Sequence, residues 1–178
     1  MPNIAVSGVP VAVPLLGFAV LAIVVVSLAL VLGRGVRPAL WTCLLLSLAA
    51  IGALTLGSAL DSGFTGAQGV NLEPFTEIDR GFNNRGTASW LNVVGNVAMF
   101  VPLGFAVACL ARGGFWARTC IAMLVGGLLS TGIEAAQYSL GRVADIDDII
   151  LNTTGALAGG VLGALISVVV LRARRRPQ

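Results

Sequence analysis

The chain has 178 residues, of which 57% are hydrophobic and only 11% are charged, with a net charge of +3 and no histidine. An ordinary soluble domain carries about 25% charged residues and could not cover so much apolar surface, so a water-soluble globular fold is excluded. The small positive excess lies in short loops and the tail, which argues against nucleic-acid binding, and the lack of histidine excludes a histidine base or a histidine-ligated metal.

Five apolar stretches are each long enough to cross a membrane as a helix, which takes about 20 residues. The sequence therefore predicts one all-α domain over residues 1–178, a polytopic transmembrane bundle of five spans. The first stretch is expected to be a true span rather than a signal peptide, because no basic side chain precedes it. The predicted spans cover about residues 11–32, 39–60, 90–111, 119–140 and 149–171.

The arginines predict the orientation of this bundle. Eight of them fall before the second span, between the third and fourth spans, and in the tail; the other side holds Arg80, Arg85 and Arg142. The protein is expected in the bacterial inner (cell) membrane. Because basic residues favour the cytoplasmic side, its N-terminus is expected outside and its C-terminus in the cytoplasm. The three cysteines then lie towards the reducing cytoplasm, and no disulfide is expected.

Residues 61–89 form the one long loop, on the outer side of the membrane. Pro74 is expected at the first position of a short helix, in which Phe75, Ile78 and Phe82 recur at helical spacing. This pattern is typical of an amphipathic helix lying in the membrane interface, and Trp90 follows where an interfacial anchor belongs.

Polar side chains inside the third and fourth spans lie in their outer halves. Ser130, Glu134 and Gln137 share one face of the fourth span, and Asn92 and Asn96 share one face of the third. Since a helix rises 1.5 Å per residue, Asn96 and Glu134 both lie about 9 Å inside the outer ends of their helices, which allows a shared site. The alternative is that these groups only form hydrogen bonds between helices.

A polar run, Arg142, Asp145, Asp147, Asp148 and Asn152, marks the outer start of the fifth span. Asp145 can cap this helix, and the other acids suit the positive end of its dipole. Arg142 could pair with an aspartate or hold an anionic headgroup. No full set of ligands for Mg²⁺ or Ca²⁺ is visible, so neither a metal nor a cofactor is expected.

Further along the fifth span, Gly155, Gly159 and Gly163 form consecutive GxxxG steps. Such steps let two helices approach closely. Close packing of this span is therefore predicted.

Three functional hypotheses follow from the polar residues. The first is a non-enzymatic binding site for the polar headgroup of an envelope lipid. The second is a hydrolase or transferase acting on a lipid-linked headgroup, with Glu134 as acid or base and Asp145 or Asp148 as its partner. The third is a scaffold in which Glu134 and Asn96 bond each other without a cavity. The candidate ligand-binding residues are Asn96, Glu134, Gln137, Arg142, Asp145, Asp148 and Asn152.

An ordered set of motifs lies between residues 70 and 160. They are Asn71-Leu72-Glu73-Pro74-Phe75, then Asn96 through Phe105 with Phe100, Pro102 and Gly104, then Ser130, Glu134 and Gln137, and finally Arg142, Asp145, Asp148, Asn152 and Gly155. Over this range the chain resembles the VanZ-like family, named after a membrane protein associated with glycopeptide (teicoplanin) resistance. The resemblance implies an integral membrane protein of the bacterial envelope with a role in glycopeptide susceptibility, and it implies no particular reaction. Membrane lipids are the expected partners, with no nucleic acid; a cell-wall precursor or a glycopeptide is a further candidate.

Overall fold

The structure is a computed structural model that describes residues 5–6, 9–10, 36–61 and 69–174. The first predicted span, about residues 11–32, lies outside the described residues. The described part is mostly helical, as predicted, and contains four helices long and apolar enough to cross a membrane. These are α2 (Val36–Asp61), α4 (Ala88–Leu110), α5 (Phe115–Ser139) and α6 (Ile146–Arg174).

These four helices correspond to the second to fifth predicted spans. Their apolar stretches match the predicted bounds to within a few residues, because a long apolar run is enough to identify a span. The remaining elements are short: β1 (Ala5–Val6) pairs antiparallel with β2 (Val9–Pro10), and β3 (Gly69–Asn71) pairs parallel with β4 (Val143–Asp145). The short helix α3 (Thr76–Asn83) precedes α4.

The helices α4 and α6 run side by side in the same direction, with α6 placed so that its glycines touch the backbone of α4. An added Cβ on any of three α6 glycines would collide with an α4 carbonyl oxygen; the pairs are Gly155 with Val97, Gly159 with Val101 and Gly163 with Phe105. The predicted close packing of the GxxxG steps is confirmed, and its partner is the backbone of α4.

The helix α5 packs against a neighbouring face of α6 and runs in the opposite direction. Gly126 of α5 lies against Ala156, whereas Gly160 of α6 lies against Ala122. The helix α2 contacts α4 and, less extensively, α5. Phe100 and Phe105 of α4 are fully buried between these helices, so α4 forms the centre of the described bundle.

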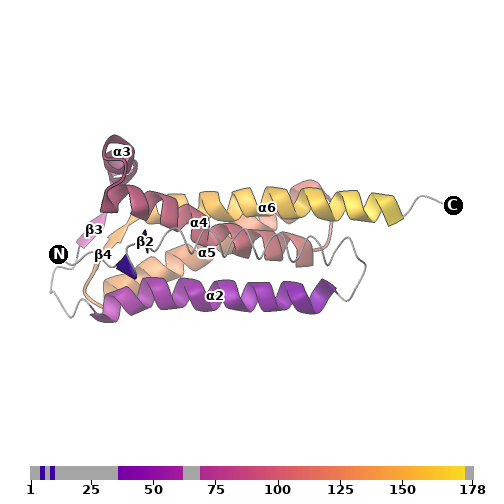
Figure 1. Cartoon of the computed structure of the whole chain (residues 1–178), viewed down its shortest axis with the longest axis horizontal. Coiled ribbons are helices and arrows are strands. Elements are labelled where there is room, and N and C mark those ends of the chain that lie inside the picture. Colours follow the sequence, from indigo (N-terminus) through magenta and orange to yellow (C-terminus); the bar gives the residue numbers. More distant parts are fainter. Residues whose placement is uncertain (1–4, 7–8, 11–35, 62–68, 175–178) are drawn as a thin grey trace.

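The bundle has two different ends (Figure 1). The polar end carries β3, α3, β4 and the start of α6, and the opposite end carries the α4–α5 link and the C-terminal part of α6. At the opposite end the buried guanidinium of Arg118 donates to the carbonyl oxygens of Ala108 and Cys109 at 2.8 and 3.3 Å. It therefore caps the last turn of α4, whose carbonyls have no partner within the helix.

The start of α3 differs from the prediction. The helix begins at Thr76, preceded by Phe75 in the left-handed region with φ of 73°, so Pro74 does not occupy the first helical position. The reason is tertiary: the first turn is held by a carboxylate from α6, described below. Figure 1 shows α3 at one side of the polar end, beside the start of α4; Phe82 of α3 and Phe75, which precedes the helix, are about half exposed.

Candidate functional site

The two short strands at the polar end join segments that lie more than 70 residues apart. In the parallel pair, Asn71 is opposite Asp145, and the Asn71 side-chain amide donates to the Asp145 carboxylate at 3.1 Å. The motif that begins at Asn71, residues 71–75, is thereby fixed against the start of α6. This pairing places β3 and the following residues over the ends of α5 and α6.

Asp145 is the central residue of this junction. One of its carboxylate oxygens accepts the backbone N–H of Asp147 at 2.9 Å, which confirms the predicted capping of α6. Its own backbone N–H donates to the Glu134 carboxylate at 2.8 Å. Asp145 therefore connects β3, α5 and the first turn of α6 through three separate hydrogen bonds.

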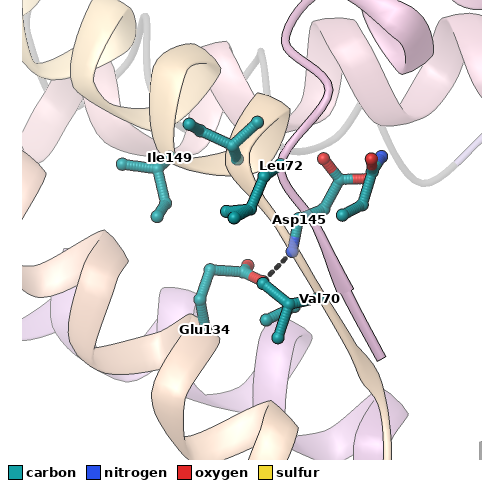
Figure 2. A pocket seen from close by; sticks show the side chains of 8 residues that line it. Val70, Leu72, Glu134, Asp145 and Ile149 are labelled. Atoms are coloured by element: carbon teal, nitrogen blue, oxygen red, sulfur yellow. Dashed lines mark hydrogen bonds between the residues drawn. The ribbon is translucent and has the colours of Figure 1, made fainter. Parts of the chain in front are cut away.

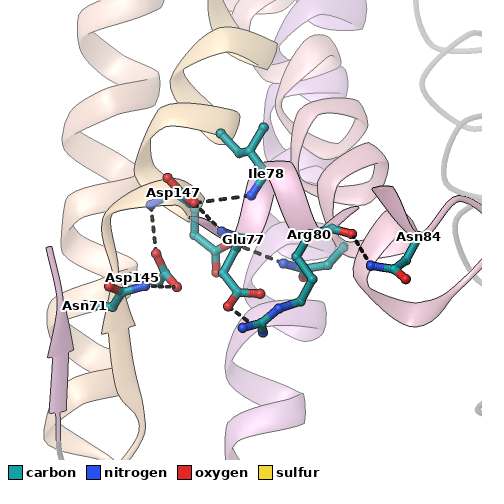
Figure 3. Close-up of polar contacts among 9 residues, drawn as sticks. Asn71, Glu77, Ile78, Arg80, Asn84, Asp145 and Asp147 are labelled. Atoms are coloured by element: carbon teal, nitrogen blue, oxygen red, sulfur yellow. Dashed lines mark hydrogen bonds and ion pairs between the residues drawn. The ribbon is translucent and has the colours of Figure 1, made fainter. Parts of the chain in front are cut away.

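Asp147 caps a helix other than its own. Its carboxylate accepts the backbone N–H groups of Phe75, Glu77 and Ile78 at 2.6, 2.8 and 3.3 Å, as Figure 3 shows for the labelled residues. The first N–H groups of a helix lack partners within the helix, and no side chain of α3 itself supplies one. The fully buried Asp147 thus anchors α3 to α6.

Asp148 faces in a third direction, towards α4. Its carboxylate accepts the side-chain amides of Asn96 at 2.5 Å and of Asn92 at 3.3 Å. The three aspartates of the run therefore contact three different elements, with Asp145 on β3, Asp147 on α3 and Asp148 on α4. Asn96 bonds Asp148 and not Glu134, so the specific contact expected of a scaffold is not the one found.

Two further polar contacts lie deeper in the bundle. The Asn152 amide donates to the hydroxyl of Ser130 at 2.9 Å, and the Asn152 carbonyl oxygen is buried without a hydrogen-bond partner in the described part of the chain. The Gln137 amide donates to the backbone carbonyl of Thr55 at 3.1 Å. These contacts join α5 to α6 and α5 to α2.

A small cavity of about 110 Å³ opens beside Glu134 at the polar end (Figure 2). Glu134 is 5% exposed, and the only hydrogen bond its carboxylate accepts within the described residues comes from Asp145. Most of the wall is apolar, and two of its members, Val70 and Leu72 of β3, are 57% and 70% exposed. The lining residues are Val70, Asn71, Leu72, Glu134, Ala144, Asp145, Ile146 and Ile149.

The polar end is also the acidic end of the molecule. The seven acidic residues whose side chains the structure describes lie at or next to it, together with Arg80, Arg85 and Arg142; these acids are Glu73, Glu77, Asp79, Glu134, Asp145, Asp147 and Asp148. Arg142 interacts electrostatically with the carboxylates of Glu134 and Asp148, and Arg80 pairs with Glu77 at 2.6 Å. The cavity therefore lies in an excess of negative charge that these arginines offset only in part.

The structure places all seven predicted ligand-binding residues at the polar end or within the helical turns next to it. Only Glu134 and Asp145 line the cavity. Sequence reasoning missed the anchoring role of Asp147 and the apolar wall from β3, because both depend on a contact across about 70 residues of sequence. The side chains of Asn96, Gln137, Asp148 and Asn152 form hydrogen bonds between helices. Arg142 interacts electrostatically with Glu134 and Asp148.

Together the fold and the polar end define a class of protein: a membrane-spanning helical bundle closed at one end by two short strands and a helix. The family model described as VanZ/LLP1 matches residues 18–168, which is most of the chain. The chain belongs to the VanZ/LLP1 family, as the resemblance of its motifs predicted. No curated protein and no solved structure matches it.

Proposed function

We propose that this protein binds the headgroup region of a membrane amphiphile at its polar end, on the outer side of the cell membrane. The observation that carries the proposal is the cavity whose wall combines apolar side chains with the buried carboxylate of Glu134. Such a combination suits a ligand with a polar group next to methylene groups. An envelope lipid or a lipid-linked cell-wall precursor has this character.

The surroundings of the cavity support a ligand that arrives from the membrane. Val70, Leu72, Phe75 and Phe82 expose apolar side chains at the polar end. Trp90 lies in edge contact with Phe82, at a centroid distance of 5.3 Å, and under the guanidinium of Arg85. Aromatic rings with an arginine partner are typical of the membrane–water interface. The exposed β3 side chains would then lie at headgroup depth, beside the cavity.

The size of the cavity favours part of a ligand over a whole glycopeptide. An apolar cavity of about 150 Å³ accommodates benzene, so one of about 110 Å³ takes a group of roughly four or five non-hydrogen atoms. A role in glycopeptide susceptibility would then act through a lipid or precursor that the protein holds. Binding of a complete glycopeptide is not supported by this volume.

The contacts of the aspartates favour binding over catalysis. A hydrolase would need a second carboxylate free to act with Glu134. The Asp145 carboxylate instead accepts from Asn71 and from the backbone of Asp147, and the Asp148 carboxylate accepts from two asparagines. Both aspartate carboxylates are engaged in hydrogen bonds that hold the fold together, and no observation favours a reaction.

The outward position of the polar end rests on the arginines. The described positions at the opposite end include Arg37, Arg112 and Arg118, and further arginines follow on α6 and in the tail. That end is therefore proposed to be cytoplasmic, which places the Glu134 cavity outside.

Lipidomics of the purified protein tests this function. The full chain is purified in a mild detergent, and co-purifying lipids are identified by mass spectrometry, in parallel with an Ala144→Leu variant. Ala144 lines the cavity, and the larger side chain should fill it. We expect one lipid class to be enriched with the parent protein and lost from the variant. Equal lipid profiles for both proteins would contradict binding at this site.

A further inference from the structure

The charge around the cavity restricts the chemistry of the amphiphile. Glu134 lies in the cavity wall, and Asp145 and Asp148 both interact with it electrostatically. Asp147 adds a fourth carboxylate beside Asp148. Arg142 is the cation that acts on Glu134 and Asp148, so the acidic side chains next to the cavity outnumber the basic side chain that acts on them. An anionic group such as a phosphate or carboxylate entering the cavity would be repelled.

The hydrogen bonds of Glu134 leave room for a donor from a ligand. A carboxylate offers about four acceptor positions on its two oxygens. Within the described residues, the Glu134 carboxylate accepts one hydrogen bond, from the backbone of Asp145. A carboxylate at membrane depth is stabilised by positive charge, and the apolar wall of the cavity strengthens any attraction between opposite charges.

From these contacts we infer that the group bound in the cavity is an ammonium ion carried by an amphiphile, with Glu134 as its counter-ion. The ammonium donates to Glu134, and the carbon atoms next to it contact Val70, Leu72 and Ile149. An aminoethyl group has about the size that the cavity accepts. This inference rests on the proposed function and adds the charge of the headgroup to it.

Three amphiphiles with the same chain length separate charge from hydrophobicity. Octylamine, octanol and octanoate are titrated into the full-length protein in detergent, and the thermal midpoint is followed to obtain an apparent Kd. Octylamine is expected to bind at least tenfold more tightly than the other two. Ethylamine, which has the ammonium without the chain, is expected to bind at least tenfold more weakly than octylamine.

Matched variants locate the effect. Glu134→Gln should weaken octylamine binding at least tenfold, whereas Glu73→Gln should leave it unchanged. Glu73 is an exposed acid of the same end that does not line the cavity, so it controls for the general negative charge. If Glu134→Gln does not fold, Ala144→Leu carries the same test by filling the cavity, with the same expected loss.

The outcomes distinguish a failure of the ammonium inference from a failure of the proposed amphiphile binding. Octanoate or octanol binding as tightly as octylamine would overturn the ammonium and leave an amphiphile site in place. Tight binding of ethylamine would overturn the amphiphile and indicate a small amine. Octylamine binding that survives both Glu134→Gln and Ala144→Leu would overturn this location. If none of the four compounds binds, the ammonium inference fails, and lipidomics decides independently on the proposed function.

Discussion

At the scale of single residues, most of the polar side chains at the polar end have structural partners. Asp147 is the clearest case, because one fully buried carboxylate holds three backbone N–H groups of α3. The sequence showed three acids at the start of a helix and a dipole that could accommodate them. It could not show that the middle acid, Asp147, caps a helix other than the one that contains it.

Asp147→Ala should lower the free energy of unfolding by about 1–3 kcal/mol, since it leaves backbone donors of α3 without a partner. The loss should appear as a lower thermal midpoint in detergent and as faster hydrogen exchange in residues 76–83. Asp79→Ala, which removes an exposed acid from the same helix, should change stability by less than about 0.5 kcal/mol. Equal effects of the two substitutions would mean that Asp147 does not anchor α3.

Asp148 and Asn96 should be energetically coupled. Single Asn96→Ala and Asp148→Ala variants and the double variant are compared by their free energies of unfolding in mixed micelles. A direct hydrogen bond predicts a coupling of about 0.5–3 kcal/mol. The control cycle pairs Asn96→Ala with Gln137→Ala, whose amide bonds Thr55 instead, and these should add. Additivity in both cycles would mean that Asp148 is available to a ligand after all.

At the scale of elements, packing depends on where a helix lacks side chains. Gly159→Ala should destabilise the protein by about 1–3 kcal/mol, because its Cβ would meet the carbonyl oxygen of Val101 on α4. Gly132→Ala is the control, since a Cβ there meets nothing within 4 Å. That substitution should leave stability unchanged or raise it by about 0.5–1 kcal/mol. A Gly159→Ala protein as stable as the parent would show that α4 and α6 are not in this contact.

The spans and the polar contacts were predictable to different degrees. Apolar runs identified the four described long helices, and the spacing of Gly155, Gly159 and Gly163 identified a contact face. The partner of that face could not be read from spacing, because several helices could have supplied it. The short strands β3 and β4 escaped prediction because three residues carry too little periodicity, and they pair over more than 70 residues of sequence.

At the scale of the whole molecule, the described part of the chain has an acid-rich end and an opposite end that carries Arg37, Arg112 and Arg118. A reporter fused after Arg176 should behave as cytoplasmic, and one inserted at Gly86, between α3 and α4, should behave as external. An insertion at Gly113 in the α4–α5 link provides the cytoplasmic control. A cytoplasmic reporter at Gly86 together with an external reporter at Gly113 would reverse the orientation and place the Glu134 cavity inside the cell.

The central claim is that a membrane amphiphile occupies the cavity beside Glu134, and photocrosslinking tests it most directly. The full-length protein is reconstituted with a lipid that carries a primary amine and a diazirine next to its headgroup, irradiated, digested and analysed by mass spectrometry. The account predicts labels in β3 and at the start of α6, at residues such as Leu72 and Ile149, and their loss in Ala144→Leu. Labels confined to the lipid-facing sides of α2 and α5, and unchanged by Ala144→Leu, would contradict this claim.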